Sequence, residues 1–147
     1  RKSGVKGILN FTSFEAFPLT SEQMLKAHEA FPELKNLATE LASLWGSTIT
    51  LPDLKFNLIL GDARNTLLTW PQKADAWFLD GFSPAKNPEL WGPTRRASVA
   101  HHTKQGGSCA TYTAAGFVRR GLQKAGFTIT RAPGFGQKRH MTQGAMQ

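Results

Sequence analysis

The chain has 147 residues, 40% of them hydrophobic and 19% charged, which predicts one soluble globular domain spanning residues 1–147. No stretch approaches the roughly 20 apolar residues of a membrane span and no signal-peptide pattern is present, so we expect a cytoplasmic protein without a membrane segment. The formal net charge of +8 indicates either a polyanionic partner such as nucleic acid or a generically basic surface, and charge alone does not distinguish the two. The single cysteine, Cys109, excludes an internal disulfide and predicts a small buried hydrophobe.

The first third of the chain predicts a strand followed by two helices. The apolar stretch Ile8–Phe14 is typical of a buried strand. Thr20 and Gln23 have the spacing of a capping box, so a helix is expected over residues 21–30. A second helix should begin at Pro32, with apolar residues at helical spacing that predict ordinary core. These residues are Leu34, Leu37, Ala38, Leu41, Leu44 and Trp45.

Strands and helices are expected to alternate in the rest of the chain. The strands are Leu54–Leu60, Ala74–Leu79 and Ser108–Thr113. A brief helix is expected through Leu67 and Leu68, and another should begin at Pro88 with Asn87 as its cap. Two more helices are expected, a weakly apolar one over residues 94–104 and one over Ala114–Ala125. Phe127–Arg131 and Lys138–Thr142 should form a closing antiparallel hairpin. This alternation predicts an α/β fold with a mostly parallel sheet.

Three of the expected strands end in a carboxylate, at Glu15, Asp62 and Asp80. Ligands of α/β sheets lie beyond the carboxyl ends of the strands, so this shared placement is the main functional signal. Glu15 could accept hydrogen bonds from both hydroxyls of a ribose, or it could only mark a solvated strand end. Asp62 could accept a hydrogen bond from an adenine amino group, or it could cap the helix that follows.

Asp80 lies in the stretch "WFLDGFSPAKNP", which has a more specific pattern. Gly81 lets the backbone approach a ligand closely, and Phe82 with Pro84 would form a rigid apolar wall beside the acid. The alternative is a local Asx turn.

Four segments resemble the methyltransferase domain of the tRNA 5-methylaminomethyl-2-thiouridine biosynthesis (MnmC) family over residues 8–144. They are "LNFTSFEAFPLT", "DAWFLDGFSPAKNPELW", "ATYTAAGFVRRGLQKAGF" and "GFGQKR". The resemblance implies a Rossmann-like class I methyltransferase fold. It also implies transfer of a methyl group from S-adenosylmethionine to the aminomethyl group of wobble 5-aminomethyl-2-thiouridine in tRNA, giving 5-methylaminomethyl-2-thiouridine.

By position, the resemblance places Glu15 on the ribose of the cofactor and Asp62 near its adenine. It places Asp80 at the methyl-transfer centre, with Phe82 and Pro84 around the uracil ring. The family also has an upstream glycine-rich turn, and since no counterpart occurs here, we expect a fold truncated at its N-terminus. The full-length family protein has a second, FAD-dependent oxidoreductase domain, which nothing in this sequence matches.

Basic side chains are expected to contact tRNA phosphates, with solvated basic faces as the alternative. These residues are Lys86, Arg119, Arg120, Lys124, Lys138 and Arg139. The four histidines show no metal-binding spacing with Cys109 or with one another, so no metal site is predicted and the histidines are expected at the surface.

Two other functions stay open. A non-catalytic fragment could bind RNA but not the cofactor, and the missing glycine-rich turn favours this alternative. A dinucleotide-dependent oxidoreductase domain would also use a strand-end acid on a ribose, but no G-x-G-x-x-G pattern follows an expected strand.

Overall fold

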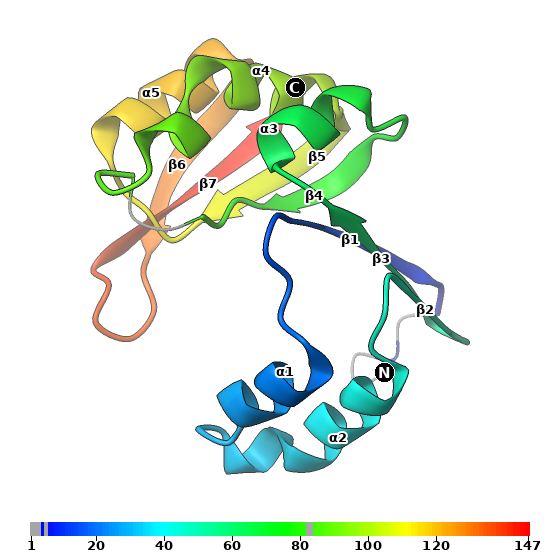
Figure 1. The fold of residues 1–147 in the computed structure, drawn as a ribbon. Helices are drawn as coiled ribbons and strands as arrows, with labels where there is room; N and C mark the ends of the chain where they lie inside the picture. Colours follow the sequence, from blue (N-terminus) through cyan, green and yellow to red (C-terminus); the bar gives the residue numbers. More distant parts are fainter. Residues whose placement is uncertain (1–3, 5, 82–83) are drawn as a thin grey trace. The chain divides into compact units, whose positions relative to one another are not determined.

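The computed structural model describes residues 4, 6–81 and 84–147 (Figure 1). Contacts between residues divide the chain into two compact units, residues 1–66 (unit 1) and residues 67–147 (unit 2). Each unit contains its own sheet. That residues 1–147 together form a single methyltransferase domain stays a prediction.

Unit 1 combines a three-stranded sheet with two longer helices. Its elements are β1 Leu9–Glu15, α1 Ser21–His28, the 3-10 helix η1 Pro32–Leu34, α2 Lys35–Leu44, β2 Thr48–Leu51, β3 Leu54–Leu60 and α3 Ala63–Thr66. The strand order is β1-β3-β2, in which β1 is parallel to β3 and β2 is antiparallel to it. The parallel pair therefore brings the carboxyl ends of β1 and β3 to one edge.

Helix α1 begins where the sequence predicts. The Thr20 hydroxyl accepts a hydrogen bond from the Gln23 backbone N–H at 3.2 Å, and the Gln23 side chain accepts one from the Thr20 N–H at 2.9 Å. Two N–H groups that a first helical turn leaves unpaired are thus satisfied, and the predicted capping box is confirmed.

The apolar stripe of α2 is largely unburied, contrary to the prediction of ordinary core. Ala38 is buried, but Leu37 is 62% exposed and Leu44 is 42% exposed. These leucines line a cavity of about 750 Å³ together with side chains of the unit 1 sheet, among them Ile49 and Leu54. The helical spacing correctly identifies the side of α2 that faces apolar residues, but the space there is not filled.

Unit 2 contains a four-stranded sheet. Its elements are the 3-10 helix η2 Leu67–Thr69, β4 Ala74–Phe78, the 3-10 helix η3 Pro88–Trp91, α4 Pro93–His101, β5 Thr103–Thr111, α5 Gly116–Lys124, β6 Phe127–Pro133 and β7 His140–Met146. The strand order is β4-β5-β7-β6, with β4 parallel to β5 and both other pairs antiparallel. The predicted closing hairpin is confirmed as β6 and β7.

The α/β class agrees with the sequence, but the share of parallel pairing does not. Among the described strands, two pairings are parallel and three are antiparallel. The sequence analysis missed β2, which joins β3 through the short turn at Pro52 and Asp53. Strand β7 is antiparallel to both of its neighbours, so a mostly parallel sheet is the wrong description.

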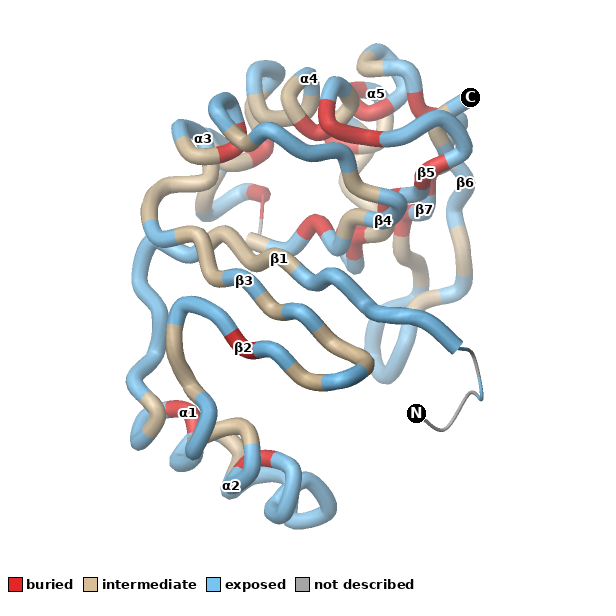
Figure 2. The backbone as a smooth tube through the Cα atoms, turned by 90° about the vertical axis from the view of Figure 1, so that its right-hand side faces the viewer, coloured by how far each residue is buried: buried red, intermediate tan, exposed pale blue. Residues whose placement is uncertain are grey.

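The core of unit 2 lies where two helices meet one face of the sheet. Val118 and Leu122 of α5 have no exposed surface, and Val99 of α4 is 2% exposed. Leu79, directly after β4, lies with these three side chains around a small internal void. Figure 2 shows buried residues along α4, α5 and β5. This packing fixes the residue that immediately precedes Asp80.

Three expectations about residues 87–108 need correction. Helix η3 begins at Pro88 as predicted, but the Asn87 side chain makes no capping hydrogen bond. Strand β5 begins at Thr103 and not at Ser108. His102 is buried and not at the surface, and its Nδ1, 3.0 Å from the backbone oxygen of Gln72, donates a hydrogen bond to that oxygen.

No helix within the described ranges combines the length and the apolar character that crossing a bilayer requires.

Cys109 offers a direct test of the unit 2 core. Its side chain is buried in β5, and burial raises the pKa of the thiol to about 11. Because the thiolate is the reactive form, about one thiol in a thousand is ionised at pH 8. We expect iodoacetamide at pH 8 to leave the folded chain unmodified and to alkylate it fully in urea, as read by mass spectrometry. Rapid alkylation of the folded chain would contradict this burial.

Candidate active site

Glu15 and Asp62 lie at the same edge of the unit 1 sheet. Glu15 is opposite Leu60 in the parallel register of β1 and β3. The pairing continues past the strand, since the Gly61 N–H donates to the Glu15 carbonyl oxygen at 2.9 Å. Each of these two acids therefore follows a strand end, as predicted, and the structure shows that the two strands are neighbours in unit 1.

The Glu15 carboxylate is exposed and has spare hydrogen-bonding capacity. It accepts one hydrogen bond, from the Ser13 hydroxyl at 3.0 Å, and no other partner occurs among residues 4, 6–81 and 84–147. A carboxylate has about four lone-pair sites. Glu15 can therefore accept further hydroxyl groups from a ligand at this edge.

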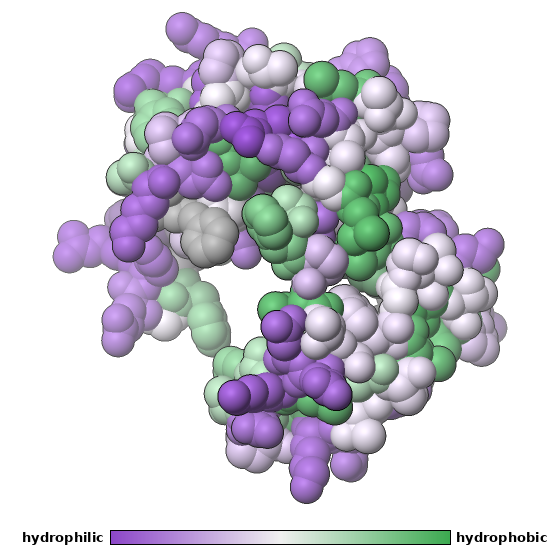
Figure 3. All heavy atoms as spheres, in the orientation of Figure 1, coloured by the Kyte–Doolittle hydropathy of each residue, from purple (hydrophilic) through white to green (hydrophobic). Residues whose placement is uncertain are grey.

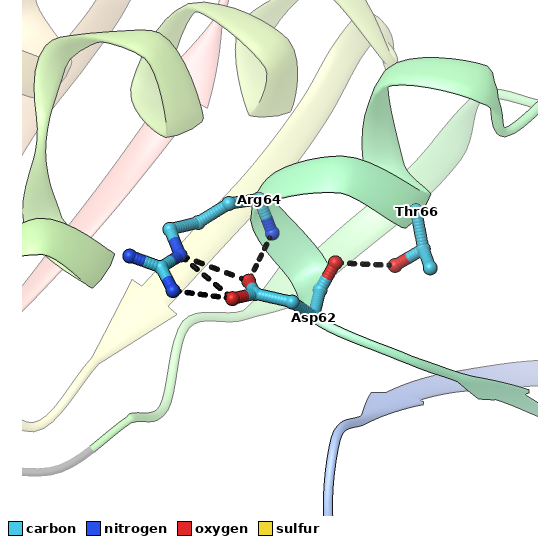
Figure 4. A network of polar contacts seen from close by, with 3 residues as sticks. All are labelled: Asp62, Arg64 and Thr66. Atoms are coloured by element: carbon cyan, nitrogen blue, oxygen red, sulfur yellow. Dashed lines mark hydrogen bonds and ion pairs between the residues drawn. The ribbon is translucent and has the colours of Figure 1, made fainter.

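Asp62, in contrast, is engaged by its own helix (Figure 4). Its carboxylate accepts a hydrogen bond from the Arg64 backbone N–H at 2.8 Å and forms an ion pair with the Arg64 guanidinium. Its carbonyl oxygen accepts from the Thr66 hydroxyl at 3.1 Å. The capping role that the sequence left open is thus present. Contact with an adenine stays a prediction, and it would require sharing the carboxylate with Arg64.

Asp80 lies at the carboxyl edge of the unit 2 sheet. The pairing of β4 with β5 extends to Leu79, whose N–H donates to the Ala110 carbonyl at 2.8 Å. The chain then leaves the sheet, and the exposed Asp80 carboxylate accepts the Gly81 N–H at 2.7 Å. One carboxylate oxygen is therefore oriented by the backbone while the group stays accessible.

Residues of η3 and α4 form hydrogen bonds with the backbone of Asp80 and Gly81. The buried indole of Trp91 donates to the Gly81 carbonyl at 3.1 Å. Arg95, stacked 5.7 Å over the Trp91 ring, donates to the Leu90 carbonyl at 3.1 Å and to the Asp80 carbonyl at 3.4 Å. These contacts fix the backbone that carries the acid.

Gly81 is required by its conformation and by its surroundings. Its φ is 143°, a region that residues with a side chain rarely adopt, and a Cβ atom there would collide with the Leu90 side chain. Pro84, three residues after Gly81, is buried, and Lys86 is exposed in the turn before η3. Phe82 lies outside the described residues, so its proposed place beside Asp80 stays a prediction.

Of the basic residues expected to bind RNA, three lie in α5, two lie in the loop between β6 and β7, and Lys86 lies in the turn before η3. Helix α5 starts shortly after the carboxyl end of β5, with Arg119 and Arg120 in its middle and Lys124 as its last residue. Lys138 and Arg139 are exposed in the loop between β6 and β7. Their contacts with RNA remain predictions.

The convergence of Glu15, Asp62 and Asp80 on one cavity also stays a prediction. The first two share an edge in unit 1, and Asp80 belongs to unit 2. No cluster of His, Cys, Asp and Glu able to hold a metal ion occurs in the described part of the chain.

Comparison with known proteins decides the family. The sequence model of the S-adenosyl-L-methionine-dependent methyltransferases matches residues 26–147, which is most of the chain. The chain belongs to this methyltransferase family. Membership favours the methyltransferase prediction over the oxidoreductase alternative, and it confirms the class of enzyme that the "WFLDGFSPAKNP" stretch indicates.

Two curated relatives of this methyltransferase are the tRNA 5-methylaminomethyl-2-thiouridine biosynthesis bifunctional proteins MnmC of Hahella chejuensis and Aliivibrio fischeri. They are 42% and 44% identical to the chain over 96% and 94% of its length. The matched regions are 24% and 22% of those proteins, so the chain spans about a quarter of their length. The predicted resemblance to the methyltransferase domain of MnmC is confirmed.

Solved structures support the methyltransferase fold. The crystal structure of MNMC2 from Aquifex aeolicus is 27% identical and has a TM-score of 0.75, with 95% of this chain and 44% of that chain covered. SAM-bound CalS10, an amino pentose methyltransferase from Micromonospora echinaspora, has a TM-score of 0.51 at 11% identity, with 95% and 84% covered. The second likeness shows the fold alone. The predicted Rossmann-like class I methyltransferase fold is confirmed.

Sequence reasoning missed several residues that support the candidate site. Trp91 is part of the "NPELW" motif, so the motif itself was a signal, although not for its bond to Gly81. Arg95 gave no local signal, because its contacts are made through the fold. The Arg64 ion pair could have been predicted, since Asp62 and Arg64 flank the first residue of α3.

Substitution of Gly81 tests how rigidly the Asp80 segment is held. Gly81→Ala should lower the free energy of unfolding by about 1–3 kcal/mol, because it forces an unfavourable φ and a collision with Leu90. Gly46→Ala is the control, since Gly46 has no left-handed φ and its nearest neighbour would be 4.0 Å away. Urea denaturation measures both changes.

Leu90→Ala in the same chain separates the two causes. The double variant should lose less stability than the sum of the two single losses, because the collision disappears while the φ strain remains. Strictly additive losses would show that Leu90 does not restrict residue 81.

Proposed function

We propose that this chain carries the methyl-transfer site of a tRNA-modifying enzyme. The proposed reaction moves a methyl group from S-adenosylmethionine to the aminomethyl group of wobble 5-aminomethyl-2-thiouridine, which yields 5-methylaminomethyl-2-thiouridine in the cytoplasm. The observation that carries the proposal is the accessible Asp80 carboxylate on a segment fixed by Trp91 and Arg95. Support comes from the two relatives named tRNA 5-methylaminomethyl-2-thiouridine biosynthesis bifunctional protein.

The cofactor would be held at the unit 1 edge. Glu15 suits the ribose, because its exposed carboxylate accepts only the Ser13 hydroxyl among the described residues. Asp62 suits the adenine less directly, because Arg64 already binds its carboxylate. When bound, the sulfonium cofactor supplies an electrophilic methyl group.

Asp80 acts in this proposal by orienting the amine. Transfer to a sulfonium methyl group requires a free nitrogen lone pair held in line with the methyl–sulfur bond. Accepting one N–H hydrogen bond points the nitrogen lone pair toward the methyl group. Alignment of the reacting atoms can contribute about 7–11 kcal/mol in favourable cases.

Two conservative substitutions separate catalysis from cofactor binding. Asp80→Asn keeps an acceptor for the Gly81 N–H but removes the charge, and should lower methyl transfer by about 100-fold or more with little change in cofactor affinity. Glu15→Gln should weaken binding of S-adenosylmethionine by about 10- to 100-fold. Transfer of a labelled methyl group to tRNA and calorimetry measure the two effects. Full activity in Asp80→Asn would remove Asp80 from the mechanism.

The non-catalytic alternative, in which the chain binds RNA but not the cofactor, is tested with a version that carries the family's upstream glycine-rich turn. Calorimetry with S-adenosylmethionine on this chain and on a version extended upstream distinguishes the two functions. We expect binding to be much tighter in the extended version, since the turn would approach the methionine portion of the cofactor. Absence of binding in both versions, with RNA binding retained, would support the RNA-binding alternative.

A further inference from the structure

The loop between β6 and β7, residues 134–139, presents an aromatic ring to solvent on a closed backbone. Phe135 is 94% exposed. The Gly134 N–H donates to the Arg139 carbonyl at 3.1 Å, and the Lys138 N–H donates to the Phe135 carbonyl at 3.1 Å. Residues 135–138 form a four-residue turn in which Gly136 is the first central residue, and its φ of 59° lies in the left-handed region that favours glycine. The ring is therefore held out in water by a fixed turn and is not part of a core.

Strand register places this loop at the same edge as Asp80. In β4 and β5, Phe78 is opposite Ala110, so Asp80 leaves the sheet beside Tyr112. In β5 and β7, Thr111 is opposite Thr142, which brings the start of the antiparallel β7 to that edge. Neighbouring strands are about 4.8 Å apart and successive strand residues about 3.3 Å apart, so the loop, which lies beyond the Pro133–His140 pair, is on the order of 20 Å from the end of β4. A few nucleotides of RNA span that distance.

The junction between β5 and the loop is well fixed. Thr142 has no exposed surface, and its hydroxyl donates to the Thr113 carbonyl at 2.7 Å. The Lys138 ammonium lies 5.6 Å from the centre of the ring of Tyr112, the residue directly after β5, in a cation–π contact. Tyr112 and Lys138 thus connect the Asp80 edge with the loop.

The surroundings of Phe135 are strongly basic. All ten acidic residues of the chain lie at or before Glu89, whereas half of the eighteen Lys and Arg follow it. Arg131, Lys138 and Arg139 are exposed around the loop, and Figure 3 shows hydrophilic side chains gathered at this end of the hairpin. An aromatic ring beside exposed cations, with no carboxylate in the same stretch of chain, matches the pattern of surfaces that bind unpaired nucleic acid.

We propose that Phe135 stacks on an unpaired base of the RNA substrate, close to the nucleotide at Asp80, while Lys138 and Arg139 contact its phosphates. This inference rests on the proposed function, which supplies the RNA. Stacking gives affinity for unpaired bases because every base has a flat π-face, and the phosphate contacts add affinity that depends on salt. The loop would thereby select single-stranded segments over paired ones.

The experiment compares RNA binding by variants of the chain at several salt concentrations. The probes are a tRNA, an RNA stem-loop with an unpaired loop, and a fully paired duplex of equal length, followed by fluorescence anisotropy. Phe135→Ala should weaken stem-loop binding by about 5- to 150-fold with an unchanged salt dependence. Phe135→Trp should preserve affinity, and Lys138→Gln should lower the slope of log affinity against log salt by about 0.7.

A second exposed phenylalanine provides the matched control. Phe17 is 92% exposed, but no Lys or Arg occurs between Lys6 and Lys26, so it lacks neighbouring cations and Phe17→Ala should leave RNA affinity unchanged. If the unsubstituted chain binds RNA and Phe135→Ala binds it equally well, the stacking inference is overturned and the proposed function stands. Equal weakening for stem-loop and duplex also overturns it. If the unsubstituted chain binds no RNA, the proposed function and the inference both fail.

Discussion

The parallel register between β4 and β5 determines which side chains of unit 2 are available for chemistry. Successive residues of a strand point to opposite faces, so a shift of one residue would exchange buried and exposed positions. With Phe78 opposite Ala110, Leu79 packs among Val99, Val118 and Leu122, and Asp80 is the first residue free of the sheet. The burial of one leucine thus sets the position of the neighbouring acid.

That register also explains why support for Asp80 comes from distant parts of the chain. The segment that leaves β4 cannot continue the ladder, so its carbonyl groups need other partners. Trp91 and Arg95 supply them from η3 and α4. Gly81 permits this arrangement because a side chain there would occupy the space of Leu90. The carbonyl groups of the irregular segment that carries Asp80 thus have partners in η3 and α4.

Sequence reasoning succeeded where the signal is local. The capping box at Thr20 and the parallel strands β1, β3 and β4 follow from patterns within a few residues. It failed where long-range packing decides. Strand β2 is only Thr48–Leu51 and gains its pairing from β3, and the burial of His102 depends on Gln72. For the site, "WFLDGFSPAKNP" indicated Asp80 and Gly81, whereas the contact of Arg95 with Asp80 spans two elements that no local pattern links.

The uneven distribution of acids along the chain has a consequence for how the protein responds to its medium. Carboxylates normally lose their charge as solutions become acidic, which changes the field of most proteins. No Asp or Glu follows Glu89, so the Lys and Arg charges of that stretch persist from mildly alkaline to strongly acidic conditions. Attraction of residues 90–147 to a polyanion is therefore governed by dissolved ions far more than by protons.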